Sequence, residues 1–252
     1  MARPLADVVA PLVADPRHGA VVCDIDGTLA PIAPTPEQAT VLPAALAQLE
    51  RLAGRYALVA CVTGRPAAQA RRMIPIERVA ISGNHGLEVM QGDTVTVVPP
   101  AARYTEAIHQ ALLLVENDGL LPEYGARVED KGITFTVHYR TSPRPDHALR
   151  YLETQIIPKL DRAGLAWSFG RMVLEVRPPV AVDKGSAIKR LRGRRRIGQL
   201  LYVGDDRTDL DAFREATIRI AVRSHEGPRR LLAEADAVVE GPEAVVDMLS
   251  SL

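Results

Sequence analysis

Continuous apolar runs alternate with amphipathic segments near both ends of the chain. Residues 57–62 are apolar throughout rather than at every second position, and so is the strand pattern at 199–203 after its first residue, Gln199. Hydrophobic spacing after each run predicts a helix. Strands that are apolar on both faces are typical of a parallel sheet covered by helices on each side. Residues typical of helix starts support the predicted helices: Pro43 stands in the first turn of one predicted helix, and Gly227 stands at the start of another. The pattern therefore predicts an α/β fold.

The pattern changes in the middle of the chain. A helical segment at 104–117, two strand patterns, a second helical segment at 146–163 with a break at Pro158, and two more strand patterns follow one another. This order is typical of an α+β module with an antiparallel sheet. We therefore predict a core formed by residues 1–100 and 180–252, an inserted module formed by residues 101–179, and a cleft at the carboxyl ends of the core strands.

Composition and charge exclude several classes of protein. The chain is 47% hydrophobic and 25% charged, which is ordinary for a globular protein. Lys and Arg total 31, as do Asp and Glu, so the protein has no overall field that would recruit nucleic acid or an anionic membrane. We interpret the basic run at 190–196 as a solvated helix end, with nucleic-acid binding as the distant alternative.

The cysteines and the first residues indicate the compartment. Cys23 and Cys61 each lie in an apolar run, so we expect two buried core thiols rather than a disulfide or metal ligands. The N-terminus lacks the pattern of a signal peptide, and no apolar run is long enough to span a bilayer. We therefore expect a cytoplasmic protein without membrane or nucleic-acid partners, and we expect a monomer.

Candidate chemistry begins where the first apolar run ends in two carboxylates. Asp24 and Asp26 are two residues apart, so on a strand their side chains point to the same side, and Gly27 lets the backbone bend sharply after them. Convergent carboxylates repel each other unless a cation or a shared proton relieves them. The pair alone fits an ordinary turn or the D-x-D motif of a metal-dependent glycosyltransferase. An EF-hand is excluded, because Gly27 comes at the fourth position of the loop rather than the sixth.

Further polar residues stand at the ends of predicted strands and the starts of predicted helices: Thr63, Lys184, Asp205, Asp206 and Asp209. Each alone has an ordinary explanation as a turn residue, a solvated lysine or a helix cap. Together, at the carboxyl edge of one parallel sheet, they suit phosphoryl transfer to a carboxylate. A glycosyltransferase does not explain them, and that alternative falls away.

Phosphoryl transfer gives the first motif and the metal their roles. We predict that Asp24 attacks phosphorus to form an aspartyl-phosphate, and that Asp26 protonates the leaving oxygen and later deprotonates the attacking water. Mg²⁺ is a hard cation that keeps several waters, so the carboxylates of Asp24 and Asp205 and the backbone carbonyl of Asp26 suffice as protein ligands. The cation removes the repulsion between the carboxylates and the incoming phosphate.

The remaining residues support that chemistry. Thr63 can donate a hydrogen bond to the transferring phosphoryl oxygens, and Lys184 offers a positive charge against them. Asp206 and Asp209 are predicted to hold Lys184 or the metal-bound waters in place.

The complete set resembles the four motifs of the haloacid dehalogenase superfamily of phosphohydrolases. Longer segments are similar to the trehalose-6-phosphate phosphatase family: DIDGTLAPI at 24–32, TGR at 63–65, GNHG at 83–86, VEDK at 128–131, HYR at 138–140, LEVRP at 174–178 and YVGDDRTDLDAF at 202–213. The resemblance implies a Rossmann-like core with an inserted, mobile cap domain, and the Mg²⁺-dependent hydrolysis of trehalose 6-phosphate to trehalose and phosphate.

The resemblance also suggests which residues of the module bind substrate. Glu129, Lys131 and Glu175 are expected to bind the sugar hydroxyls through strong hydrogen bonds, with ordinary strand-surface charge as the alternative. Arg65 is expected to contact the phosphate or to pack at a helix start. We assign His85 and His138 structural roles, because the mechanism already has its acid and base.

Three alternative functions stay open from the sequence. The catalytic motifs do not separate trehalose 6-phosphate from another sugar phosphate, such as sucrose phosphate or a mannosyl-glycerate phosphate. A phosphomutase would use the same aspartyl-phosphate but shield it from water. A receiver-like or catalytically silent sugar-phosphate-binding module belongs to a different class, although the complete catalytic set argues against a silent enzyme.

Overall fold

The computed structural model describes residues 4–33, 35–170, 172–224 and 228–252, and contacts divide the chain into two units. Unit 1 comprises Met1–Thr96 and Val182–Leu252, and unit 2 comprises Val97–Ala181. The sequence pattern predicted an inserted module at 101–179. No helix among the described residues is long and apolar enough to cross a membrane.

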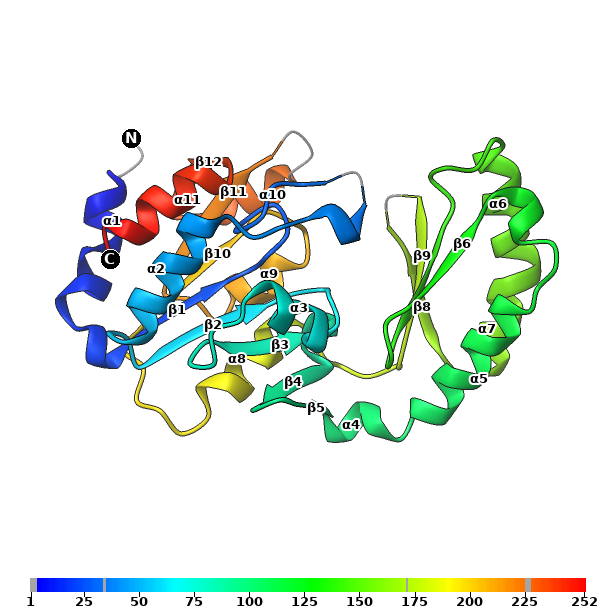
Figure 1. The fold of residues 1–252 in the computed structure, drawn as a ribbon, viewed down its shortest axis with the longest axis horizontal. Coiled ribbons are helices and arrows are strands. Elements are labelled where there is room, and N and C mark those ends of the chain that lie inside the picture. The colour runs from blue at the N-terminus through cyan, green and yellow to red at the C-terminus, as the bar shows by residue number, and fades with distance from the viewer. Residues whose placement is uncertain (1–3, 34, 171, 225–227) are drawn as a thin grey trace. The chain divides into compact units, whose positions relative to one another are not determined.

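Unit 1 is built on an eight-stranded sheet in the order β12-β11-β10-β1-β2-β3-β4-β5 (Figure 1). Its strands are β1 (Gly19–Cys23), β2 (Leu58–Val62), β3 (Ala80–Gly83), β4 (Glu88–Gln91), β5 (Thr94–Val97), β10 (Gln199–Gly204), β11 (Ile218–Arg223) and β12 (Ala237–Glu240). The strands from β12 to β3 run parallel, and β4 pairs antiparallel with β3. The predicted α/β fold with a largely parallel sheet is therefore confirmed.

Helices cover both faces of this sheet, as the apolar strands predict. They are α1 (Leu5–Ala14), α2 (Pro43–Ala53), α3 (Ala67–Met73), α8 (Lys184–Arg192), α9 (Asp209–Phe213), α10 (Arg229–Glu234) and α11 (Gly241–Ser250), with short 3₁₀ turns η1 (Pro16–His18), η2 (Pro36–Gln38) and η3 (Asn84–Gly86). Gly227, expected to open the helix observed as α10, lies outside the described residues.

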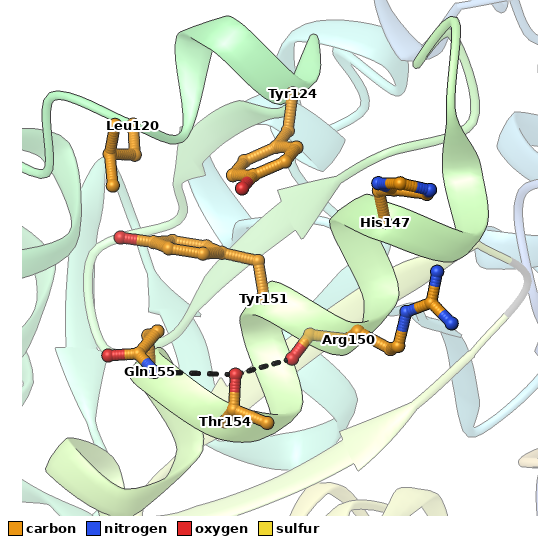
Figure 2. A pocket seen from close by; sticks show the side chains of 7 residues that line it. All are labelled: Leu120, Tyr124, His147, Arg150, Tyr151, Thr154 and Gln155. Atoms are coloured by element: carbon orange, nitrogen blue, oxygen red, sulfur yellow. Dashed lines mark hydrogen bonds between the residues drawn. The ribbon is translucent and has the colours of Figure 1, made fainter.

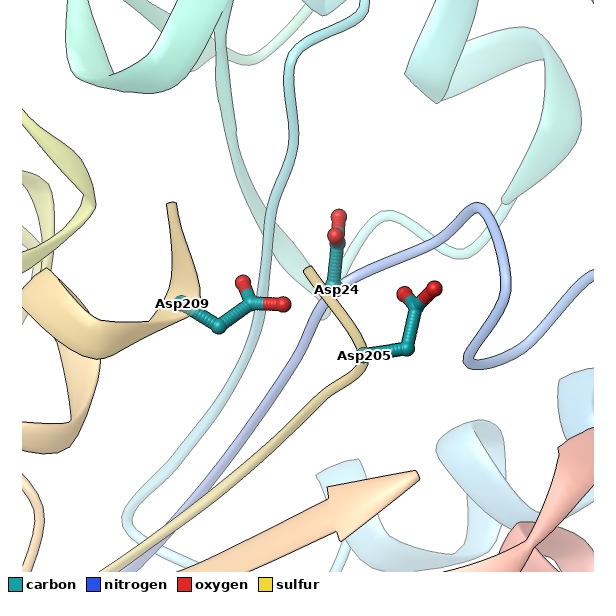
Figure 3. A group of neighbouring side chains, drawn as sticks. All are labelled: Asp24, Asp205 and Asp209. Atoms are coloured by element: carbon teal, nitrogen blue, oxygen red, sulfur yellow. The ribbon is translucent and has the colours of Figure 1, made fainter. Parts of the chain in front are cut away.

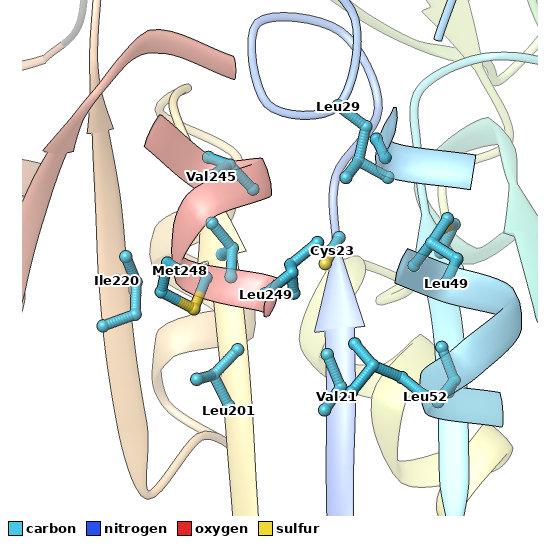
Figure 4. Packing of buried hydrophobic residues seen from close by; sticks show 14 of the residues in the cluster. Val21, Cys23, Leu29, Leu49, Leu52, Leu201, Ile220, Val245, Met248 and Leu249 are labelled. Atoms are coloured by element: carbon cyan, nitrogen blue, oxygen red, sulfur yellow. The ribbon is translucent and has the colours of Figure 1, made fainter. Parts of the chain in front are cut away.

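Alternate residues of β1 enter two separate hydrophobic clusters. Val21 and Cys23 pack with side chains of α2 and α11, as Figure 4 shows. Ala20 and Val22 pack with side chains of α8 and α9 on the other face. Because neighbouring side chains of a strand point to opposite faces, this division shows that the central strand is buried on both sides. Cys23 and Cys61 are buried free thiols, as predicted.

Unit 2 contains a four-stranded antiparallel sheet in the order β6-β7-β9-β8, with helices packed on one face. The strands are β6 (Arg127–Asp130), β7 (Phe135–His138), β8 (Ala166–Phe169) and β9 (Val173–Arg177), and the helical segments are α4 (Pro99–Ala102), α5 (Thr105–Glu116), η4 (Pro122–Tyr124), α6 (Pro145–Tyr151), η5 (Leu152–Ile156) and α7 (Ile157–Arg162). Helix, two strands, helix and two strands follow in the predicted order.

The helical segment predicted at 146–163 changes its winding just before Pro158. A π-helical segment, η5, separates α6 from α7, and Pro158 lies in the first turn of α7. A proline has no backbone N–H, and its ring crowds the carbonyl four residues earlier. A wider turn relieves that crowding, so the chain stays helical where the sequence predicted a break.

Candidate active site

The centre of the candidate site is an ion pair between Asp24 and Lys184. Asp24 follows β1, and its backbone N–H donates to the carbonyl of Val203 at 2.9 Å. Lys184 is the first residue of α8, which begins with a capping box between Asp183 and Ser186. The capped helix start holds Lys184 Nζ 2.7 Å from Asp24 Oδ2, and both residues are buried. Two distant parts of the sequence thus place opposite charges in contact.

Asp209 completes this buried cluster from the fourth motif. Its Oδ1 accepts hydrogen bonds from Lys184 Nζ and from the Tyr202 hydroxyl, each at 2.7 Å, and its Oδ2 accepts one from the Asp206 backbone N–H at 2.7 Å. The side chain of Asp209 is completely buried, whereas Asp206 is exposed. Asp209 therefore fixes Lys184 directly, and the Asp206 contact in this network comes from its backbone.

Asp205 follows β10 and lies beside the first motif. Its Oδ1 accepts a hydrogen bond from the Thr28 hydroxyl at 3.3 Å. Gly27 has a φ of +74° and packs so closely that an added Cβ would collide with the Asp205 carboxylate. Gly27 is needed for both reasons, because residues with a Cβ rarely adopt this conformation and have no space here.

Burial decides the charge balance of these groups. Burial raises the pKa of Asp24 well above its ordinary value, although the positive charge of Lys184 acts to lower it. The negative charges of Asp209 and Asp205 raise the pKa of Asp24 further. Burial and the charge of Asp209 raise the pKa of Asp205 to about 7. Burial acts to lower the pKa of Lys184, but the charges of Asp209 and Asp24 outweigh it and raise that pKa. The cluster holds more carboxylates than Lys184 can neutralise.

This excess of buried carboxylate fits a hard divalent cation. Carboxylate oxygens of Asp24, Asp205 and Asp209 lie within 4.8 Å of one another, and Figure 3 shows the three side chains as neighbours. Distance alone admits all three as ligands, but the Asp209 oxygens already accept three hydrogen bonds. Asp24 and Asp205 are therefore the better carboxylate ligands, which is the pair that the sequence predicted.

Asp26 and Arg65 form a second ion pair at this edge. Arg65 Nε lies 2.6 Å from Asp26 Oδ2, and Arg65 Nη2 lies 2.7 Å from Asp26 Oδ1. Arg65 Nη1 donates to the carbonyl of Pro36 at 2.9 Å. The sequence reasoning expected Arg65 to contact phosphate or pack at a helix start. In the structure the Arg65 guanidinium binds Asp26, and Arg65 stands just before the start of α3. Its predicted contact with phosphate stays a prediction.

Thr63 stands at the same edge of the sheet, directly after β2. The register pairs Cys23 of β1 with Cys61 of β2, which places the residues after both strands side by side. Thr63 is buried, its backbone N–H donates to Ser82, and its hydroxyl accepts from the backbone N–H of Arg65 at 3.3 Å. The topology therefore brings Thr63 to the edge that carries Asp24.

The sequence reasoning missed Thr28 and Tyr202. Thr28 donates to Asp205, and Tyr202 donates to Asp209. A tyrosine near the end of an otherwise apolar strand was the available signal, because a buried hydroxyl needs a partner. Thr28 gave a weaker signal, since threonine is common in turns.

The predicted sugar-binding residues lie in unit 2, on the sheet face opposite the helices. The register aligns Glu129 with Thr136, Thr136 with Glu175, and Glu175 with Ser168 in one polar row across the sheet. The neighbouring positions Phe135, Val137, Leu174 and Val176 pack against the helices instead. Alternation along the strands thus gives unit 2 one polar and one apolar face.

Glu129 is the best-anchored residue of this polar face. Its Oε2 lies 2.7 Å from His138 Nε2 and 3.8 Å from Lys131 Nζ. Burial acts to raise the pKa of Glu129, but the hydrogen bond from His138 and the charge of Lys131 hold it below the ordinary value. Glu129 therefore stays ionised beside Lys131, and His138 has a structural contact as expected.

A shallow pocket lies elsewhere in unit 2. It has a volume of about 350 Å³, and the rings of Tyr124 and Tyr151, which are part of its lining, have centroids 4.9 Å apart and are tilted by 32° (Figure 2). The described residues that line it are Leu120, Tyr124, His147, Arg150, Tyr151, Thr154 and Gln155. The predicted sugar-binding residues are not among them, so this pocket is separate from the polar sheet face.

Comparison with known proteins identifies a family. The sequence matches the trehalose-phosphatase family over residues 22–229. A probable trehalose-phosphate phosphatase of Sinorhizobium fredii is 30% identical, with 98% of this chain and 92% of that protein covered. A trehalose-phosphate phosphatase of Mycobacterium marinum is 32% identical, with 92% of this chain and 61% of that protein covered.

Some relatives are much longer than this chain. An uncharacterized glycosyl hydrolase of Mycobacterium tuberculosis is 35% identical over 94% of this chain, but the chain spans only 18% of that protein. The match therefore concerns one part of the mycobacterial protein.

Solved structures agree on the fold. A trehalose-6-phosphate phosphatase related protein superposes with a TM-score of 0.76 at 24% identity, covering 92% of this chain and 95% of that chain. The C-terminal domain of the C. albicans trehalose-6-phosphate phosphatase gives a TM-score of 0.73 at 20% identity, covering 99% and 96%.

Proposed function

Because the chain belongs to the trehalose-phosphatase family, we propose that it is a phosphatase that hydrolyses trehalose 6-phosphate to trehalose and inorganic phosphate. The observation that carries the proposal is the buried cluster in which Lys184 binds Asp24 and Asp209, with Asp205 beside them. A nucleophilic carboxylate, a fixed cation and a second carboxylate for a metal are the parts that phosphoryl transfer to aspartate requires.

The reaction then has two steps. A carboxylate oxygen of Asp24 forms a bond to phosphorus while the bond from phosphorus to the sugar oxygen breaks, and Asp26 gives its proton to that oxygen. Water then attacks phosphorus, Asp26 takes a proton from the water, and the bond between Asp24 and phosphorus breaks. Asp24 and Asp26 return to their starting states, so the net reaction is hydrolysis.

Lys184 and Thr63 stabilise the charge that moves during both steps. Lys184 is buried beside the nucleophile, so its positive charge acts on the phosphoryl oxygens in a poorly solvated site, where electrostatic interactions are strong. The Thr63 hydroxyl offers a hydrogen bond to the same oxygens. Asp209 keeps Lys184 in place through the contact at 2.7 Å.

We propose Mg²⁺ as the cofactor, held by the carboxylates of Asp24 and Asp205 and the backbone carbonyl of Asp26. When bound, the ion offsets the repulsion between the phosphate dianion and these carboxylates. Burial raises the pKa of Asp24 and of Asp205, and the charge of Asp209 raises both further, so a bound cation would offset a cost that both carboxylates carry.

We assign unit 2 as the cap and unit 1 as the phosphohydrolase core. Glu129, Lys131 and Glu175 are the proposed sugar-binding residues, since they combine both signs of charge on one polar sheet face. A disaccharide has many hydroxyl groups, and charged side chains form strong hydrogen bonds with them. The relatives named trehalose-phosphate phosphatases support this choice of sugar.

A panel of phosphate esters tests the proposal. Phosphate release is measured from trehalose 6-phosphate, sucrose phosphate, a mannosyl-glycerate phosphate and glucose 6-phosphate, with Mg²⁺ present. We expect trehalose 6-phosphate to give the highest kcat/KM by at least tenfold. Comparable release from another ester would overturn the sugar assignment, and an isomerised sugar phosphate without free phosphate would identify a phosphomutase.

Asp24→Asn is the matched control for the panel. We expect no turnover, because the carboxamide is not a nucleophile, while circular dichroism reports a folded protein. A loss of stability is expected, because a carboxamide at this position cannot accept hydrogen bonds from both Ile25 and Lys184, which contact different oxygens of the carboxylate, and it removes a charge that Lys184 binds. Near-normal turnover of this variant would refute the role of Asp24.

A further inference from the structure

Arg65 binds Asp26 through a two-pronged contact that leaves little freedom to the carboxylate. Both oxygens of Asp26 accept one hydrogen bond each, at 2.6 and 2.7 Å, from different nitrogens of the same guanidinium. Such bidentate pairs fix the plane of a carboxylate as well as its position. The Asp26 side chain is 35% exposed and lies in the turn after β1, so the contact with Arg65 restricts a carboxylate that would otherwise be free to rotate.

Arg65 is itself held firmly. The residue is 7% exposed, and its Nη1 donates to the Pro36 carbonyl. Its backbone is fixed on both sides, because its N–H donates to the Thr63 hydroxyl and its carbonyl accepts from the Asn84 N–H at 2.8 Å. The guanidinium is therefore a rigid support, and its position depends on the strand ends that also carry the proposed catalytic groups.

The backbone that carries Arg65 is anchored by η3. Asn84 and His85 have φ values of 47° and 53°, a conformation that costs free energy for residues other than glycine. The His85 N–H donates to the Thr63 carbonyl at 2.9 Å, and Glu88 accepts from the Ala67 N–H at 2.7 Å. The strained turn is thus tied to Thr63 on one side of Arg65, and strand β4, which follows the turn, is tied to Ala67 on the other side.

We propose that Arg65 is a positioning residue that orients the Asp26 carboxyl group for proton transfer, rather than a ligand of the substrate. This inference rests on the proposed function of Asp26 as acid and base. Each carboxylate oxygen has two lone pairs, so one hydrogen bond to each leaves a site at which the proton can be carried and delivered. A lysine would keep the charge at position 65 but lose the planar fork, so Arg65→Lys separates orientation from charge.

The first experiment measures kcat and KM for Arg65→Lys and Arg65→Gln on the best ester of the panel. We expect kcat to fall by about 10- to 100-fold, because general acid and base catalysis by one residue contributes about 10²- to 10⁴-fold and a misoriented carboxyl loses part of it. KM should stay within about twofold of the wild-type value. A raised KM with unchanged kcat would show that Arg65 binds substrate, and unchanged kinetics would overturn the inference outright.

The second experiment uses leaving groups of different basicity. A sugar alkoxide needs a proton to leave, whereas p-nitrophenolate leaves without one. In single-turnover measurements, Arg65→Lys should therefore slow release from the sugar phosphate at least tenfold more than release from p-nitrophenyl phosphate. Equal losses on the two esters would indicate a general structural defect and overturn the inference.

If the enzyme does not hydrolyse p-nitrophenyl phosphate, a double-mutant cycle that combines Arg65→Lys with Asp26→Asn replaces the second experiment. If Arg65 acts only through Asp26, adding Arg65→Lys to Asp26→Asn should cost no further activity. Additive losses would place the effect of Arg65 elsewhere in the site.

Arg219 supplies the structural control. Arg219 lies in β11 and forms a similar fork on Asp236, just before β12, with distances of 3.1 and 2.8 Å. Arg219→Lys should leave kcat and KM unchanged at a comparable shift in Tm. The proposed substrate and the proposed role of Arg65 can be refuted separately. If the wild-type enzyme prefers another ester, the substrate assignment is wrong, and the Arg65 variants are measured on that ester instead. If the wild-type enzyme is active and the Arg65 variants have the same kinetics, only the role of Arg65 is wrong.

Discussion

Lys184 bridges Asp24 and Asp209, with its ammonium nitrogen 2.7 Å from an oxygen of each. All three groups are buried, so neither carboxylate has water to replace the lysine. An interaction of this kind is costly to break on one side, because the remaining charges stay buried without compensation. The same lysine therefore supports both the fold at the sheet edge and the charge of the proposed nucleophile.

Removing Asp209 should destabilise the protein more than removing Asp206. Asp209→Ala leaves the Tyr202 hydroxyl without its buried acceptor and leaves Lys184 with Asp24 alone, so we expect a loss of about 1–3 kcal/mol in the free energy of unfolding. Asp206→Ala removes an exposed side chain and keeps the backbone N–H that donates to Asp209, so its unfolding curve should match that of the wild type. Urea denaturation measures both, and equal losses would contradict this account of the cluster.

Stabilisation by Mg²⁺ should grow as the pH rises through about 7. Burial raises the pKa of Asp205 to about 7, whereas an unfolded aspartate titrates near about 4. Between these values the metal-free folded chain binds a proton that the unfolded chain has released, so this group's contribution to stability is lost as the pH rises. Metal binding needs the deprotonated carboxylate, so the opposite trend holds for the bound form.

Thermal unfolding with and without Mg²⁺ measures this effect. The increase in Tm caused by Mg²⁺ should be larger at about pH 8 than at about pH 6. In Asp205→Asn the increment should be small at both values. An increment in the wild type that does not change with pH would argue against Asp205 as a ligand.

Gly27→Ala should impair the site far more than Gly92→Ala. Both glycines have positive φ, +74° and +59°, so both substitutions carry the cost of a left-handed conformation, about 1 kcal/mol. Only at Gly27 does the added methyl collide with the Asp205 carboxylate, because nothing lies within 4 Å of the Cβ position at Gly92. Mg²⁺ titration by calorimetry should show weakened binding in Gly27→Ala alone, and equal binding in the two variants would contradict the packing argument.

Glu175→Gln tests the polar face of unit 2. A hydrogen bond between a charged group and a sugar hydroxyl contributes about 1.5–3 kcal/mol, so the KM for trehalose 6-phosphate should rise by about tenfold or more. Hydrolysis of a small ester without the second sugar should be unaffected, because Glu175 lies in unit 2 and the proposed catalytic residues lie in unit 1. Glu116→Gln, at an exposed position of helix α5 on the other side of the sheet, is the matched control. A parallel loss on both esters would remove Glu175 from sugar recognition.

The sequence by itself determined the local features of this protein. Apolar runs predicted strands buried on both faces, and β1, β2 and β10 are such strands. The order of the motifs predicted that the proposed catalytic residues follow the ends of these strands, because the carboxyl ends of parallel strands meet at one edge of the sheet. These inferences depend on spacing along a few residues, which strand geometry fixes directly.

The tertiary structure alone decided which side chains meet. Arg65 and Asp26 are 39 residues apart, Lys184 and Asp24 are 160 apart, and Thr28 and Asp205 are 177 apart. Such pairs depend on strand order, register and the path of each loop, and no local pattern encodes them. Asp26 shows the consequence: its place after β1 could be predicted from the sequence, but its partner could be recognised only when β1 and β2 were aligned side by side.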